Sequence, residues 1–152
     1  MSDKEKMRIL GLDVGSHTIG VAVSDQLAVF AQGLKTIKRK SMETDLHEIS
    51  AIISELEIEK IIVGLPKNLD GSLGPQAEVS LQWIRALRRR FRLPVVGWDE
   101  RLSTIGASRA LFEADVSRKK RKAVIDKMAA VFILQGYLDK KRKGKDGSVL
   151  RP

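Results

Sequence analysis

The sequence predicts an α/β fold in which one mixed five-stranded sheet is flanked by helices. Three β-rich runs separated by short turns form the front of the chain, and the remainder alternates segments of helical period with short apolar runs. A length of 152 residues with 43% apolar content is enough for one domain with a buried core. We therefore expect a single domain over residues 1–139 and a basic, mobile tail over residues 140–152.

The front of the chain is expected to form an antiparallel meander. Residues 8–14 and 19–25 are β-rich runs separated by the turn Gly15-Ser16-His17-Thr18, and residues 28–38 can supply a third strand. The first run is apolar on both faces, which is typical of a strand in the middle of a covered sheet.

Helix and strand alternate after the meander. Residues 43–56 carry apolar side chains at helical spacing and precede the apolar strand 60–64, which predicts a parallel crossover. A turn-rich loop then leads to a helix whose start is marked by Gly74-Pro75, and a strand follows over residues 93–99. Parallel strands place their carboxyl ends at one edge of the sheet, and the functional crevice is expected there.

The remaining elements are helical. One helix is expected after Ser103-Thr104, whose hydroxyls suit a helix cap, and the last over residues 122–139. At about 100° per residue, Asp126 falls at the edge of the inward face of this last helix.

Composition excludes several kinds of site. The chain has no cysteine, so disulfides and thiolate metal sites are ruled out, and His17 and His47 are too few and too far apart to suggest zinc. Any metal would therefore be held by oxygen. No apolar signal segment stands at the start, and no apolar run approaches membrane-spanning length, so we expect a cytoplasmic protein.

The charge favours a polyanionic partner. Net charge is +9, from 28 basic against 19 acidic residues, and the basic residues are clustered. Arg85, Arg89 and Arg92 fall on one solvated arc of the helix that begins near Pro75. The simpler interpretation is a set of solvated faces that maintain solubility. The three clusters are Arg88-Arg89-Arg90, Arg118-Lys119-Lys120-Arg121-Lys122 and Lys140-Lys141-Arg142-Lys143.

Asp13 is the most informative candidate for a functional residue. It interrupts the apolar run of the first strand, where an ionised carboxylate is costly unless it meets a cation or strong donors. Donors from the following turn are the structural alternative to a metal.

Two further carboxylates are candidates to join it. Asp99 and Glu100 close the strand over 93–99, and adjacent strand residues point to opposite faces, so only one of them can readily face the site. Asp126 faces inward or nearly so, although it could simply favour the positive end of its helix. Carboxylates brought together in this way would repel one another unless cations neutralised them, and Mg²⁺ or Mn²⁺ suits carboxylate and water ligands.

The residues also carry a resemblance to the YqgF family, also called RuvX. It spans nearly the whole chain, in the order of the family's motifs. The matching blocks are Asp13-Val14-Gly15, Ile19-Gly20-Val21-Ala22-Val23-Ser24-Asp25, Val63-Gly64-Leu65-Pro66, Asp70-Gly71-Ser72, Asp99-Glu100-Arg101-Leu102-Ser103-Thr104 and Asp126-Lys127-Met128-Ala129-Ala130.

The resemblance implies a ribonuclease H-like fold related to the Holliday-junction resolvase RuvC. It also implies a cytoplasmic nuclease that matures the 5′ end of precursor 16S ribosomal RNA, with Asp13, Glu100 and Asp126 as the acidic active-site residues. One position departs from the family pattern, because His17 and Thr18 stand where basic residues usually precede Ile19. We interpret His17 as a polar turn residue rather than a catalytic base.

The resulting hypothesis is a metal-dependent nuclease acting on structured RNA. Asp13, Glu100 and Asp126 would bind Mg²⁺ or Mn²⁺. The alternatives are a junction-resolving nuclease acting on branched DNA, a binding protein without catalysis, and an actin-like ATPase, for which the chain is too short. The oligomeric state, monomer or homodimer, stays open. The residues expected to hold the nucleic-acid backbone are Lys67, Arg101, Arg85, Arg89, Arg118, Lys119, Lys120, Arg121 and Lys122.

Overall fold

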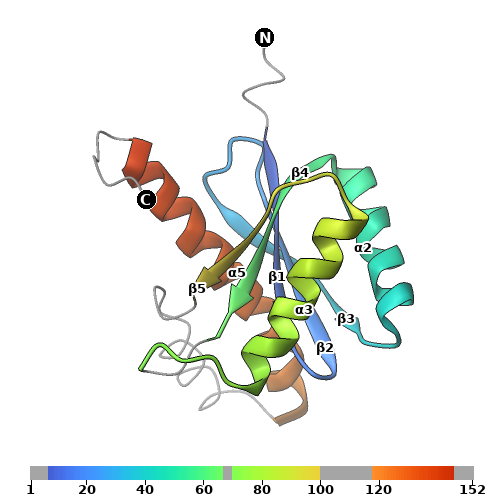
Figure 1. The fold of residues 1–152 in the computed structure, drawn as a ribbon. Helices are drawn as coiled ribbons and strands as arrows, with labels where there is room; N and C mark the ends of the chain where they lie inside the picture. The colour runs from blue at the N-terminus through green and yellow to red at the C-terminus, as the bar shows by residue number, and fades with distance from the viewer. Residues whose placement is uncertain (1–6, 67–69, 100–117, 146–152) are drawn as a thin grey trace.

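A five-stranded mixed sheet forms the centre of the protein, as the sequence predicts (Figure 1). The computed structural model describes residues 7–66, 70–99 and 118–145, with side chains in the last helix described for residues 127–142. The strand order is β3-β2-β1-β4-β5. The strands are β1 (Arg8–Val14), β2 (Thr18–Ser24), β3 (Ala31–Lys38), β4 (Ile58–Leu65) and β5 (Val95–Asp99).

The first three strands form the predicted antiparallel meander. The turn between β1 and β2 is closed by a 2.8 Å hydrogen bond from the Gly15 N–H to the Thr18 carbonyl. Pairing places Asp13 opposite Gly20 and Gly20 opposite Thr36, so these three residues form one row across the sheet. β4 and β5 continue the sheet in parallel with β1, which makes β1 a central strand.

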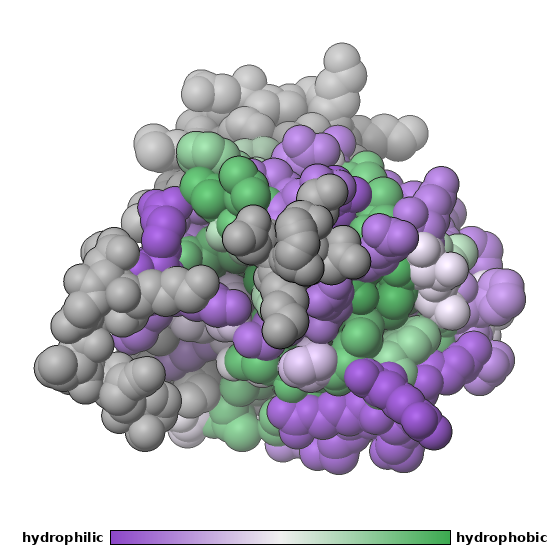
Figure 2. Space-filling model, turned by 90° about the horizontal axis from the view of Figure 1, so that it is seen from above, coloured by the Kyte–Doolittle hydropathy of each residue, from purple (hydrophilic) through white to green (hydrophobic). Residues whose placement is uncertain are grey.

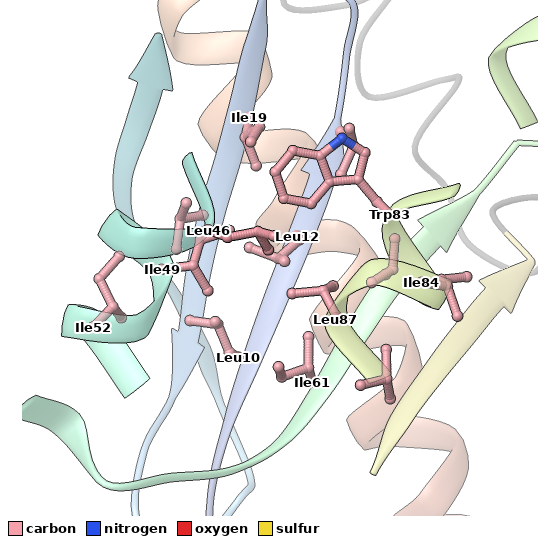
Figure 3. Close-up of a cluster of buried hydrophobic side chains, with 14 of the residues drawn as sticks. Leu10, Leu12, Ile19, Leu46, Ile49, Ile52, Ile61, Trp83, Ile84 and Leu87 are labelled. Atoms are coloured by element: carbon pink, nitrogen blue, oxygen red, sulfur yellow. The ribbon is translucent and has the colours of Figure 1, made fainter. Parts of the chain in front are cut away.

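Helices α2 (Met42–Leu56) and α3 (Pro75–Arg90) cover one face of the sheet. Their apolar sides pack on the even-numbered residues of β1, and Trp83 of α3 is fully buried there (Figure 3). Burial of these apolar side chains supplies the main stabilisation of this half of the protein. The side chains that the close-up labels are Leu10, Leu12, Ile19, Leu46, Ile49, Ile52, Ile61, Trp83, Ile84 and Leu87.

Helix α5 (Arg118–Lys145) covers the opposite face and runs antiparallel to β1. Lys141 Nζ lies 4.0 Å from Met7 Sδ, just before β1, whereas Ala130 and Leu134 lie over Gly11 in its middle. The glycine permits this approach: a Cβ at position 11 would be 2.8 Å from the Leu134 Cβ. The N-terminal part of α5 therefore reaches the edge at which β1 ends.

The last helix is longer than the sequence predicts. We expected it over residues 122–139, but α5 continues through Lys145, so residues 140–145 of the predicted tail are helical. Lysine and arginine favour helical conformation, and basic side chains interact well with the negative end of the helix dipole. Lys141 also lies over the ring of Tyr137, with its Nζ 6.0 Å from the ring centroid.

The end of the molecule at which β1 begins has an apolar component. Seen from that side, apolar side chains reach the surface between hydrophilic ones (Figure 2). The β2–β3 loop lies there and exposes Leu27 and Phe30, each at 69%. Asp25 fixes the loop, because its Oδ1 accepts the Val29 N–H at 2.7 Å and the Phe30 N–H at 3.1 Å. These exposed apolar residues lie at the edge opposite Asp13.

No helix in the described parts of the chain combines the length and apolar character that crossing a bilayer would require.

Candidate active site

Asp13 lies at the carboxyl end of β1, on the face that α5 covers. It is half-buried, and the pleat puts it on the same side as Ile9, which packs against α5, and Gly11. Its cross-strand neighbours Gly20 and Thr36 have small side chains. The carboxylate therefore stands in a row of the sheet whose other members have small side chains.

The backbone of Asp126 lies near the same position along β1 as Asp13. Asp126 lies one helical turn before Ala130, whose carbonyl oxygen would be 3.3 Å from a Cβ at Gly11. One turn of helix advances about 6 Å, and the two residues from Gly11 to Asp13 advance about 7 Å in the same direction. The antiparallel packing of α5 on β1 thus brings position 126 to the level of Asp13.

The third predicted ligand, Glu100, lies outside the described residues, as do Lys67 and Arg101. Asp99 is described as the last residue of β5, paired in register with Leu65. Its neighbour Trp98 packs in the α5-side cluster, so Asp99 lies on the opposite face. Strand β4 separates β1 from β5, so Asp13 and Asp99 are on strands that are not adjacent.

Arg85 and Arg89 do not come together with Asp13. Both are exposed on α3, which packs on the face of the sheet opposite to the one that carries Asp13. The five basic residues Arg118–Lys122 occupy the first turns of α5, at the same edge as Asp13, and their side chains lie outside the description. The predicted basic residues are therefore divided between the two helix layers.

Arg39, which was not predicted from the sequence, stabilises the turn after β1. Its guanidinium donates to the Gly15 carbonyl at 2.8 Å, and its backbone N–H donates to the His17 carbonyl at 2.9 Å. The same guanidinium lies 5.5 Å from the Trp83 ring centroid and 3.9 Å from the buried carboxylate of Asp45. The run Lys38-Arg39-Lys40 after the predicted third strand was the signal that could have drawn attention to it.

His17 is an exposed turn residue, as the sequence analysis proposed. Its Nδ1 lies 2.9 Å from the Ser16 hydroxyl, and its carbonyl accepts the hydrogen bond from Arg39. Nearby, Gln76 at the start of α3 donates to the Val14 carbonyl at 3.0 Å. These hydrogen bonds connect the β1–β2 turn with the end of β3 and with the start of α3.

Metal ligation rests on residues that are only partly described. Within residues 7–66, 70–99 and the described side chains of α5, no group of three or more histidine or acidic side chains is arranged to hold a metal ion. Asp13 lies within that part of the chain, whereas the carboxylates of Glu100 and Asp126 fall outside it. The chemistry of this donor set, three carboxylates, suits a hard divalent ion.

The sheet order, the helix laid across one face and the carboxylate at the end of β1 define a ribonuclease H-like protein. Thermus thermophilus RuvC, solved in complex with a Holliday junction substrate, matches the fold with a TM-score of 0.60 at 14% identity, covering 91% of this chain and 97% of RuvC. The chain belongs to the RuvX family, whose model, described as Holliday junction resolvase, matches residues 7–140.

Curated relatives support this membership over nearly their whole length. A protein from Desulfitobacterium hafniense is 58% identical over 133 residues, covering 88% of this chain and 92% of the relative. Another from Halothermothrix orenii is 58% identical over 137 residues, with 90% and 98% covered. A third, from Clostridium kluyveri, is 54% identical over 134 residues, with 88% and 98% covered. Each carries the name "Putative pre-16S rRNA nuclease".

Proposed function

We propose that this protein is a divalent-metal-dependent nuclease that hydrolyses phosphodiester bonds in structured RNA. Its substrate would be the 5′ end of precursor 16S ribosomal RNA, and it would act in ribosome biogenesis in the cytoplasm. The observation that carries the proposal is the half-buried carboxylate of Asp13 at the end of a central strand, on the face crossed by α5. The name shared by relatives at 54–58% identity supports the substrate.

Asp13, Glu100 and Asp126 would hold Mg²⁺ or Mn²⁺ in this proposal. The chemistry of this donor set fits such an ion, because hard divalent ions prefer carboxylate oxygens and Asp13 presents a carboxylate near the end of the central strand β1. The bound ion would supply an activated water and stabilise charge on the leaving oxygen. Glu100 is preferred to Asp99 because Asp99 lies on the face away from α5.

Basic residues would position the substrate backbone. At the edge beside Asp13, the start of α5 carries five of them, and α2, α3 and α5 all begin there, so the positive ends of three helix dipoles face an incoming polyanion (Figure 1). Arg85 and Arg89 on the other layer would contact only a substrate large enough to reach around the molecule. The proposed set of backbone contacts is Lys67, Arg101, Arg85, Arg89, Arg118, Lys119, Lys120, Arg121 and Lys122.

A second candidate function is cleavage of branched DNA. The family description and the fold shared with RuvC favour it, and the same metal-assisted chemistry would serve. Only a direct comparison of substrates separates the two.

The test is the Asp13→Asn variant, assayed on RNA containing the 5′ end of precursor 16S rRNA and on a four-way DNA junction. We expect cleavage to be lost while binding is largely retained, because asparagine keeps the shape of the side chain but removes the charge that holds the metal. Chelator should abolish wild-type cleavage, and Mg²⁺ or Mn²⁺ should restore it.

Asp139→Asn is the matched control. It removes one negative charge from the opposite end of α5, where Asp139 is half exposed and pairs with Arg142 at 3.5 Å. This control should cleave like the wild type. Full activity of Asp13→Asn with metal present would refute the proposed site, and preferential cutting of the DNA junction would replace the RNA function with the second candidate.

A further inference from the structure

Lys38 is the last residue of β3 and lies at the same edge of the sheet as Asp13. It is paired in register with Thr18, the first residue of β2, and its side chain is exposed. The row that contains Asp13, Gly20 and Thr36 lies two residues away along the strands, with the row of Val14, Ile19 and Ile37 between the two. Lys38 is thus two strands away from Asp13, about 10 Å across the sheet, and two residues, about 7 Å, nearer the edge.

The pleat directs Lys38 to the face that carries Asp13. Its neighbour Ile37 is buried in the core beneath α2 and α3, and Arg39 turns to the same side, over Trp83. Side chains alternate along a strand, so Lys38 points to the opposite face, the one crossed by α5. The lysine and the carboxylate therefore share one surface of the sheet.

The charge of Lys38 is available to a ligand. Among the described residues its ammonium has neither a hydrogen bond nor an ion pair, whereas two neighbouring cations are engaged. Lys35 pairs with Glu48 at 3.0 Å, and Arg39 is bound to the Gly15 carbonyl and to Asp45. Of the two lysines in β3, Lys38 is therefore the one whose ammonium is available to bind an anion.

We propose that Lys38 binds a backbone phosphate of the nucleic-acid substrate on the β3 side of the scissile bond. This inference rests on the proposed nuclease function. It adds the direction in which the nucleic-acid backbone leaves the active site. From Asp13 the backbone would run across the ends of β2 and β3 at this edge of the sheet, towards Lys38. A lysine is suited to this task because its ammonium acts as a point charge that meets a phosphate from several directions.

The test compares Lys38→Gln with Lys35→Gln by measuring RNA binding in chelator over a series of salt concentrations. Both variants remove one positive charge from β3, but Lys35 faces α2. We expect Lys38→Gln to weaken binding by about tenfold or more, the loss of one charged hydrogen bond. It should also make the slope of log affinity against log salt shallower by about 0.7 to 0.9, one phosphate contact.

Lys35→Gln should bind with the wild-type slope, and Lys38→Arg, which keeps the charge, should retain most of the affinity. With metal present, cleavage by Lys38→Gln should show a raised KM, since the substrate contact is lost before the chemical step. If Lys38→Gln keeps the wild-type slope and affinity, the inference is wrong although the nuclease function stands. If the wild type neither binds nor cleaves RNA or junction DNA, the proposed function itself fails.

Discussion

Gly11 shows how a single residue sets the distance between the sheet and α5. Because glycine has no side chain, the backbone of β1 can approach Ala130 and Leu134. This contact sets how the start of α5 is positioned along the axis of β1. Since Asp13 is two residues further along the strand, the same contact governs how far position 126 stands from the carboxylate.

Gly11→Ala is expected to lower the free energy of unfolding by about 1 to 3 kcal/mol, the usual cost of overpacking a core. The new Cβ would lie 2.8 Å from the Leu134 Cβ, an atom that cannot move without its helix. Chemical denaturation monitored by circular dichroism would measure the change.

Gly33→Ala is the control for this prediction. A Cβ at Gly33 would be 2.7 Å from the Cγ of Lys127, but that atom belongs to a flexible side chain that can rotate away. We expect a loss smaller than about 1 kcal/mol, partly offset by the lower entropy of the unfolded chain. Equal losses in the two variants would contradict the assignment of Gly11 as the rigid contact.

At the scale of elements, the start of α2 shows how a few neighbouring residues determine where a helix begins. Ser41 is the N-cap, with its hydroxyl accepting the Thr44 N–H at 3.1 Å, and the acidic Glu43 and Asp45 follow in the first turn. Asp45 also accepts the Lys40 N–H at 3.1 Å, so the helix start is joined to the segment that carries Arg39. The cap therefore supports the edge of the candidate site as well as the helix.

Ser41→Ala should destabilise the protein by about 1 kcal/mol, because the N–H of Thr44 loses its acceptor. Ser54→Ala is the matched control, since Ser54 is exposed inside the same helix and alanine has the higher helix propensity there. Thermal unfolding should show a lower midpoint for the first variant and an unchanged or slightly higher one for the second. A lower midpoint for both would indicate that the cap is not responsible.

Most of the helices and strands could be predicted from the sequence, because the spacing of apolar residues and the presence of turn residues are local properties of the chain. The meander, α2, α3 and the five-stranded sheet are confirmed, and the family resemblance is confirmed by the comparisons. The order of strands was not predictable in the same way. Nothing in the period of β4 shows that it pairs with β1 and so separates Asp13 from β5.

The site was predicted only in part, because some of its residues are defined by contacts between segments that are distant in sequence. Asp13 stood out because a charge in an apolar strand is costly, and the structure places it at the expected edge. Arg39 did not stand out, because its role depends on contacts with Gly15, Asp45 and Trp83, which are distant in sequence. The roles of Glu100 and Asp126 remain predictions.

At the scale of the whole molecule, the net charge and the arrangement of the helices both bear on how a polyanion would bind. The net charge of +9 attracts a polyanion from any side, but the exposed basic residues lie on both layers, and the helix N-termini face one edge only. Long-range attraction would bring the substrate to the protein, and the edge beside Asp13 would decide where it is cut.

Removing residues 140–152 should weaken RNA binding without preventing folding. The truncation removes six basic residues and one acidic residue, lowering the net charge from +9 to +4, while the apolar contacts of α5 up to Leu138 remain. We expect lower affinity at low salt and a smaller difference near 1 M salt, where charges are screened. Affinity unchanged at low salt would show that the basic C-terminal segment takes no part in binding.

The order of elements, with α5 after all five strands, has a consequence for biosynthesis. The strands leave the ribosome before α5, so the face formed by Ile9, Ala22, Ile62 and Trp98 stays uncovered until α5 emerges. If Asp126 completes the metal site, a nascent or prematurely terminated chain holds Asp13 but lacks its partner. Such a chain would be inert towards the RNA around it, and cleavage would begin only after α5 has been synthesised and has packed on the sheet.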